Sequence, residues 1–273
     1  MSRRLASVLL HAALFAASVL SLLPLLWMLS ASLMPAGEAS TVPPRFLPSA
    51  PTLAHYHELF ARLDLARAFV NSLAIAVVTT VVSVTLNALA GYGFARFAFA
   101  GRDRIFALLL LALVIPGQLG MLPLFLLLRT LGLVNTYLGV LVPGLASIFG
   151  IFLVRQYALG IPQSLLDAAR VDGAGELRVF WSVVVPLCRP VLVTLALFTF
   201  MGTWNDFLWP LIVLSDTRLQ TLPVALANLL GEHVQDTELM MAGAVVTVLP
   251  VIAVFLALQR SYIEGIASGS VKQ

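Results

Sequence analysis

Long uncharged stretches constrain this chain more than any other feature of its sequence. A helix needs roughly 20 mainly apolar residues to cross the roughly 30 Å hydrocarbon core of a bilayer. Five stretches reach that length between charged residues, namely 5–34, 68–95, 105–128, 130–154 and 239–259. They predict an all-α membrane protein, because a helix satisfies all of its own backbone hydrogen bonds in lipid.

The composition agrees with this prediction. Hydrophobic residues make up 60% of the 273 residues, charged residues only 11%, and the mean hydropathy is +0.99. A soluble domain is about one quarter charged, so this chain lacks the polar groups to cover a water-facing surface. A sixth span is expected over about 190–207, where Arg189 and Asp206 lie close enough to the ends to reach an interface.

The distribution of basic residues predicts the orientation of the six helices. With the N-terminus in the cytoplasm, only Arg45, Arg62, Arg67, Arg129 and Arg218 of the 16 basic residues lie outside. This excess of positive charge inside places both termini in the cytoplasm. The first span follows Arg3 and Arg4 but is longer than the apolar region of a signal peptide, so we expect a retained anchor.

The spans divide the chain into segments of different character. We expect an N-terminal anchor helix at 1–34, an extracytoplasmic loop at 35–67, a core of five spans at 68–262 and a cytoplasmic tail at 263–273. The outer loop is rich in proline, which favours an extended path, but its run "HYHELFARL" predicts a helix. The cytoplasmic loop 155–189 is unusually charged for this chain, which indicates a binding surface for a soluble partner.

Several kinds of chemistry are excluded. The phosphate-binding loop of a nucleotide hydrolase needs a lysine after its glycines, whereas the only lysine is Lys272. A single cysteine, Cys188, excludes a disulfide and a multi-cysteine metal site. The four histidines, His11, His55, His57 and His233, form no zinc-protease motif. The chain has no basic cluster for nucleic acid. We therefore expect no enzyme, no metal and no cofactor in this chain.

The charged cytoplasmic loop contains a short helix with recognisable ends. In "PQSLLDAARVDGAGELRVFWSVVVP", Ser164 and Asp167 have the spacing of an N-terminal capping box. Leu165, Ala168 and Ala169 have the spacing of one helix face. Gly173 is expected at the C-cap, where a positive φ favours glycine.

The same string resembles the EAA motif of ATP-binding-cassette importer permeases, which is Glu-Ala-Ala, three residues, Gly, nine residues and Ile-x-Leu-Pro. The matching positions are Asp167, Ala168, Ala169, Gly173, Val183, Val185 and Pro186. Asp for Glu, and Val for Ile and Leu, are departures that keep the character of each side chain. The strings "GYGFARFAFAGR", "WNDFLWPL" and "YIEGIASGSVKQ" are similar to the smaller permease subunit of the maltose-type carbohydrate importers.

This resemblance implies a type I importer permease with six transmembrane helices, in a bacterial inner membrane. It implies three protein partners, which are a second, related permease, a homodimeric cytoplasmic ATPase that holds the ATP and Mg²⁺, and an extracytoplasmic sugar-binding protein. Membrane lipid surrounds the two permeases. The residues expected to contact the ATPase are Asp167, Ala168, Ala169, Asp172, Gly173 and Pro186. The outer segment 214–238 is expected to reach the binding protein, and the tail 264–273 the ATPase.

The solute pathway is less clearly marked. Asn71, Asn87, Gln118 and Asn205 are candidate lining residues, although such side chains also join helices in a bilayer. Two alternatives stay open at this stage. One is an importer permease for a non-sugar solute such as glycerol phosphate, and the other is a self-contained secondary carrier or channel.

Overall fold

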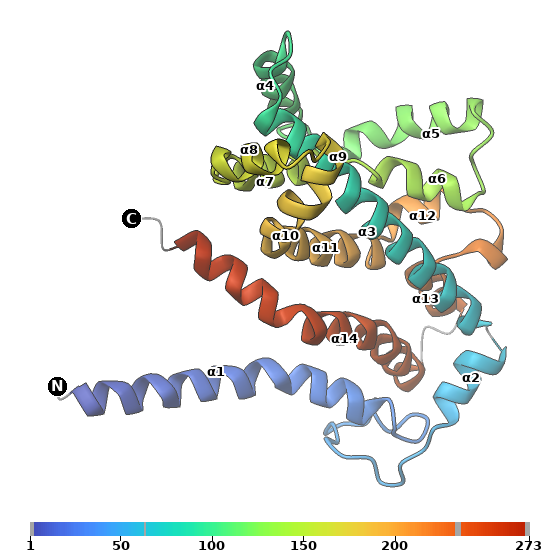
Figure 1. Ribbon diagram of the computed structural model, residues 1–273. Coiled ribbons are helices and arrows are strands. Elements are labelled where there is room, and N and C mark those ends of the chain that lie inside the picture. Colours follow the sequence, from blue (N-terminus) through green and yellow to red (C-terminus); the bar gives the residue numbers. More distant parts are fainter. Residues whose placement is uncertain (1–2, 63, 233–235, 271–273) are drawn as a thin grey trace. The chain divides into compact units, whose positions relative to one another are not determined.

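A computed structural model describes residues 3–62, 64–232 and 236–270, with the side chains of 7–61, 64–228 and 236–259. All regular elements in these ranges are helices, which confirms the all-α prediction. Figure 1 shows them along the chain. The longer helices are α1 (Arg3–Ala31), α3 (Leu65–Arg96), α4 (Arg102–Ala112), α5 (Met121–Thr130), α7 (Ile148–Leu159), α11 (Arg189–Trp204), α13 (Leu222–Glu232) and α14 (Thr237–Ser270). The shorter ones are α2 (Ala54–Arg62), α6 (Tyr137–Leu141), α8 (Gln163–Val171), α9 (Glu176–Val179), α10 (Val185–Leu187) and α12 (Leu208–Val213). Between them lie three 3₁₀ turns, η1 (Gly117–Gly120), η2 (Val142–Gly144) and η4 (Thr217–Leu219), and one π-helix, η3 (Phe180–Val184).

Four helical segments in the described residues are long and apolar enough to cross a membrane, or up to six if each of two bent pairs is one span. The four are Ser7–Ala31, Leu65–Arg96, Tyr137–Leu159 and Thr237–Gln259. The bent pairs are Arg102–Ala112 with Gly117–Thr130, at 97°, and Glu176–Leu187 with Arg189–Trp204, at 81°.

Two expected spans have different boundaries in the structure. The stretch 105–128 is not one helix, because the helix stops at Ala112 and a sharp bend precedes η1. Pro116 adopts an extended ψ of 127° at the bend and lacks the N–H that a continuous helix needs. The stretch 130–154 is displaced, since the helical segment begins at Tyr137 and ends at Leu159. Gly132 and Asn135 have positive φ, and this forms a turn where charge counting alone allowed a helix.

The chain forms two compact units, which are described separately. The first contains residues 1–66 and 225–250. Here α2 confirms the helix expected from "HYHELFARL", apart from its last residue, Leu63, which lies outside the described residues. Buried Ala31, Met34 and Ala39 pack with Trp27 and Met241, so the end of α1 and the start of α14 share a small core.

Polar side chains organise the extended segment of the first unit. Glu238 is almost fully buried and accepts a hydrogen bond from the Ala39 amide at 2.7 Å. His55 Nε2 lies 2.9 Å from the Met34 carbonyl oxygen. These contacts satisfy backbone groups that a loop without regular structure leaves free.

The second unit contains residues 67–224 and 251–273. Its larger core joins α3, α7, α8, α9, η3 and α11. The fully buried side chains include Ala158, Leu166, Val179 and Phe180. In Figure 1, α7, α8 and α9 gather near the C-terminal end of α3. The short helices of the charged loop 155–189 are thus packed directly onto the long apolar helices of the same unit.

Close contact between α3 and α7 requires glycine at one position. A Cβ atom built on Gly91 lies 2.7 Å from the Val154 Cβ and 2.9 Å from the Arg155 backbone nitrogen. The neighbouring Gly93 on the same helix has its nearest such atom, in the Phe97 ring, at 4.0 Å. The two helices can therefore approach this closely only because residue 91 has no side chain.

We predict that Gly91→Ala destabilises the protein by about 1–3 kcal/mol, because the added methyl group overpacks against the α7 backbone. Gly93→Ala is the matched control and is expected to unfold at or slightly above the wild-type temperature, because alanine favours the helix over glycine. Thermal unfolding of the detergent-purified variants measures the difference. Equal unfolding temperatures for the two variants contradict the packing argument.

Candidate functional site

Helix α8 ends in a Schellman motif, which gives the charged loop 155–189 a defined shape. Gly173 has φ +82°, and its amide donates to the Arg170 carbonyl at 3.0 Å. The Ala174 amide donates to the Ala169 carbonyl, also at 3.0 Å. This pair of bonds defines the motif and satisfies carbonyls at the helix end. The C-cap role expected of Gly173 is thus confirmed.

Helix α8 begins earlier than the capping box predicts, and its predicted face is largely exposed. Pro162 occupies the N-cap position without a side-chain cap, and the helix begins at Gln163. The predicted capping box is wrong because Ser164 already lies inside the first turn, where its hydroxyl cannot cap the helix. Leu165 and Ala168 are exposed, whereas Ala169 is half-buried against the core beside the fully buried Leu166. The three predicted residues do lie on one side of α8, but only Ala169 of that side packs against the core.

A set of ion pairs fixes the outer side of this loop. Arg170 Nε donates to Glu176 Oε1 at 2.8 Å, and Arg170 Nη1 donates to Asp167 Oδ1 at 2.9 Å. The hydrogen bonds to Glu176 and then to Asp167 raise the pKa of Arg170. A single guanidinium therefore joins α8 to α9 across the glycine turn, in the forked geometry that lysine cannot reproduce.

Helix α3 binds the first residue of α8 and the first residue of α9. Arg96 Nη2 donates to the carbonyl of Ala158, at 2.6 Å, and to that of Ile161, while Nη1 donates to Gln163 at 3.2 Å. The Tyr92 hydroxyl donates to Glu176 Oε2 at 3.4 Å. Arg96 thus caps the C-terminal end of α7, as a cation stabilises a helix C-terminus, and ties the first residue of α8 to α3.

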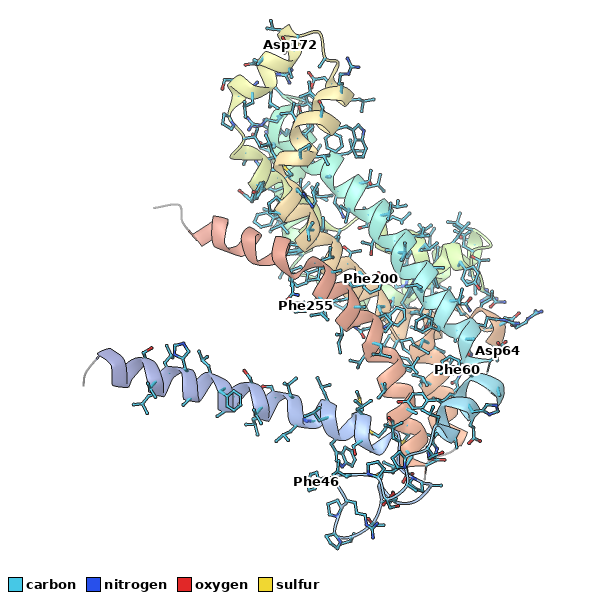
Figure 2. All side chains as sticks on the ribbon, turned by 60° about the horizontal axis from the view of Figure 1, so that its bottom comes forward. Phe46, Phe60, Asp64, Asp172, Phe200 and Phe255 are labelled. Atoms are coloured by element: carbon cyan, nitrogen blue, oxygen red, sulfur yellow. The ribbon has the colours of Figure 1, made fainter. Side chains whose placement is uncertain are left out.

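The loop therefore presents a helix of fixed orientation, with Asp172 at its tip in Figure 2. Five of the six residues expected to contact a partner are exposed, and these are Asp167, Ala168, Asp172, Gly173 and, on α10, Pro186. The sixth, Ala169, packs toward the chain's own core. Sequence reasoning missed Val171 and Leu177, whose exposed fractions are 87% and 70%. Apolar residues inside a charged loop are the signal that marks them.

The four candidate pathway residues do not gather at one place. Asn71 donates to the carbonyls of Arg218 and Gln220, both at 3.0 Å, and so holds the loop between α12 and α13. Asn87 is buried, and its Oδ1 accepts a hydrogen bond from the Ser147 amide at the start of α7. Asn205 is exposed and donates to its own helix. Gln118 alone of the four lines the cavity described next.

A cavity of about 450 Å³ opens in the second unit between α3, η1, η2 and the α11–α12 junction. Its polar lining comes from Ser72, Thr79, Gln118, Thr203, Asp206 and Thr221. Trp209 adds an aromatic ring whose indole N–H donates to the Gly139 carbonyl at 3.1 Å. A cavity of this size suits a small solute.

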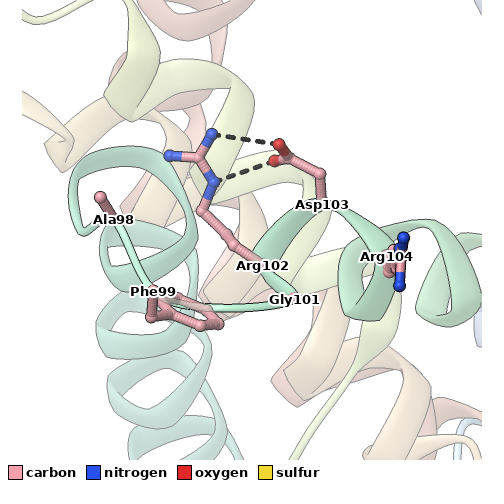
Figure 3. Close-up of a pocket in the computed structure, with 6 residues that line it drawn as sticks. All are labelled: Ala98, Phe99, Gly101, Arg102, Asp103 and Arg104. Carbon is pink, nitrogen blue, oxygen red and sulfur yellow. Dashed lines mark hydrogen bonds and ion pairs between the residues drawn. The ribbon is translucent and has the colours of Figure 1, made fainter.

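A second hollow lies on the turn that joins α3 to α4 (Figure 3). Arg102 and Asp103 form a two-point ion pair there, with Arg102 Nε 2.9 Å from Asp103 Oδ1. The lining comes from six residues of one exposed turn. It is a surface hollow in which Arg102 and Asp103 already bind each other, so we assign it no ligand.

The loop after α12 has its own anchor. Asn135 Oδ1 accepts hydrogen bonds from the amides of Ser215 and Asp216, at 3.0 and 2.9 Å. Hydrogen bonds from the Arg218 side chain and amide lower the pKa of Asp216 to about 2, so this carboxylate is charged at any physiological pH. The expected binding-protein segment 214–238 thus begins in a fixed turn, while its residues 233–235 lie outside the described residues. Residues 271–273 of the tail, which is expected to contact the ATPase, also lie outside the described residues.

Comparison with known proteins shows the family. The family model for the binding-protein-dependent transport system inner membrane component matches residues 83–266. The arabinooligosaccharides transport system permease protein of Halalkalibacterium halodurans is 38% identical over 93% of this chain and 92% of its own length. The lactose transport system permease protein of Rhizobium radiobacter is 34% identical over 99% of this chain and 98% of its own length. The trehalose transport system permease protein of Mycobacterium tuberculosis is 36% identical, with 92% and 93% covered.

A solved structure of a bacterial transporter that imports the acidic polysaccharide alginate shares the fold. One of its chains aligns with a TM-score of 0.82 at 24% identity, over 95% of this chain and 98% of that one. The chain described here is therefore a membrane permease subunit of an ATP-binding-cassette importer. It belongs to the binding-protein-dependent transport system inner membrane component family. Such a subunit is not itself an enzyme, since the ATPase of the transporter is a separate subunit.

We predict that Gly173→Ala loosens α8, because an L-residue in the left-handed region costs about 1–2 kcal/mol. Gly175→Ala is the control, since Gly175 has φ −69° and an added Cβ has equally open space there. Hydrogen–deuterium exchange over residues 163–176 is expected to rise in the first variant only. Identical exchange in both variants contradicts the role assigned to the Schellman motif.

Proposed function

We propose that this chain is a permease subunit of a carbohydrate importer, and that α8 transmits the action of a cytoplasmic ATPase to the membrane helices. The names of the relatives support the cargo, since arabinooligosaccharides, lactose and trehalose are all sugars. The observation that carries the coupling role is α8 itself. It is a short exposed helix with the EAA spacing, fixed to α3 by Arg96.

We infer six transmembrane spans with both termini in the cytoplasm, in a bacterial inner membrane. Each of the two bent pairs then counts as one span. The excess of arginine in the segments assigned to the inside supports this orientation. In this arrangement α8 and the α3–α4 turn lie on the cytoplasmic side, and the Asn135-anchored turn lies outside.

The proposed assembly pairs this chain with a second permease like the larger maltose-type subunit. Two copies of an ATPase, which carry the ATP and Mg²⁺, and an extracytoplasmic sugar-binding protein complete it. All side chains of α1 from Ser7 to Leu26 are exposed, so α1 has a surface for lipid or the second permease. The exposed Ala168, Val171 and Leu177 are the surface proposed to enter the ATPase.

Ala168 offers a sharp test, because it is exposed on α8 and small enough for close approach by a partner. We predict that Ala168→Arg abolishes sugar-stimulated ATP hydrolysis by the purified complex. Ala100→Arg, on the exposed α3–α4 turn, introduces the same side chain away from α8 and is expected to keep the stimulation. Both complexes are first compared for their content of ATPase subunit.

The outcomes separate this proposal from its alternatives. Full stimulation in Ala168→Arg rules out the coupling surface. Uptake of glycerol phosphate but of no sugar by the wild-type importer changes the cargo to a non-sugar solute. Ion-driven flux through the purified chain without ATP or partners replaces the proposal by a secondary carrier or channel.

A further inference from the structure

The cavity in the second unit has polar groups that the fold itself does not use. Among the described residues, the Thr79 and Thr221 hydroxyls are buried and have no hydrogen-bond partner. The two residues are only 2% and 4% exposed, and both belong to the cavity wall. A buried hydroxyl without a hydrogen-bond partner costs free energy. A conformation in which a ligand bonds to this hydroxyl recovers that free energy.

Thr79 differs in this respect from other helical threonines of the chain. The hydroxyls of Thr80, Thr85 and Thr194 each donate to the carbonyl four residues earlier, at 2.6, 2.8 and 3.0 Å. This bond is the usual way in which a helical threonine satisfies its hydroxyl. Because Thr79 does not make it, the buried hydroxyl has no bond to lose when rotation about χ1 turns it toward the cavity.

The charge of the wall restricts the ligand. Asp206 is half-buried at the α11–α12 junction, and its Oδ1 accepts a weak hydrogen bond from the Trp209 amide at 3.4 Å. It is the only charged residue among those that line the described cavity. A carboxylate there accepts hydrogen bonds from hydroxyl groups and repels an anionic solute. The Gln118 amide and the Trp209 ring complete a lining of the kind that sugars favour.

We propose that this cavity is a solute subsite within this chain, and that it binds an uncharged saccharide through Thr79, Thr221 and Asp206. The inference rests on the proposed carbohydrate function and deepens it by excluding acidic sugars. Ser72 also lines the cavity, but its hydroxyl already accepts a hydrogen bond from the Leu222 amide at 2.7 Å. The subsite therefore depends on the groups that the fold leaves unpaired.

The test uses cells that express the complete importer. Uptake of labelled arabinotriose, lactose and trehalose is measured beside that of trigalacturonate, an acidic saccharide. We expect uptake of at least one neutral sugar and none of trigalacturonate. Thr79→Val and Thr221→Val keep the side-chain shape and are each expected to lower neutral-sugar uptake about fivefold to tenfold, the effect of one lost hydrogen bond.

Thr80→Val is the matched control, since it removes a neighbouring hydroxyl that bonds only to its own helix. It is expected to transport at the wild-type rate when uptake is normalised to the amount of complex in the membrane. Asp206→Asn is expected to reduce neutral-sugar uptake and to admit trigalacturonate.

Two failures have different meanings. Wild-type rates in both valine variants overturn the subsite while the importer function stands, and so does trigalacturonate uptake by the wild type. No saccharide uptake by the wild type overturns the proposed cargo itself. As a second measurement, Gln118→Cys in a Cys188→Ala background is labelled with a small thiol reagent. Protection by the transported sugar supports the subsite, and labelling at the same rate with and without sugar contradicts it.

Discussion

The capping of α7 by Arg96 is the interaction on which the proposed coupling site depends. One guanidinium from the end of α3 binds the carbonyls of Ala158 and Ile161 and the side chain of Gln163. The end of a membrane helix, the turn after it and the start of α8 are therefore held by one residue. About one and a half turns earlier, Gly91 lets α3 and α7 meet closely, so the two helices are joined at two places.

The ion pairs across the glycine turn extend this connection outward. Arg170 joins Asp167 on α8 to Glu176 on α9, and Tyr92 binds Glu176 from α3. A force applied to α8 thus reaches α3 by two routes. The same helix α3 carries Thr79 in the wall of the cavity, so one element connects the proposed ATPase surface with the proposed solute subsite.

The sequence predicted the features that depend on local chemistry. Hydropathy indicated the apolar helices, since lipid permits few other structures, and Gly173 was identified because a positive φ strongly favours glycine. The bend before Pro116 and the shifted start at Tyr137 were missed, because counting charges does not detect a helix break. Which face of α8 is buried depends on Leu166 entering a core built from distant helices. For the same reason the sequence could not tell that Thr79 lines a cavity while Asn71 and Asn87 support the backbone.

Site-specific crosslinking from α8 tests whether the exposed side of this helix contacts the ATPase. In the complete importer with Cys188→Ala, the two adjacent residues Ala168 and Ala169 are replaced by cysteine one at a time and treated with a short thiol-to-amine crosslinker. We expect that residue 168, which is exposed, crosslinks to the ATPase, and that residue 169, which packs inward, does not. Crosslinking from neither position, or equally from both, contradicts a coupling helix with the orientation described.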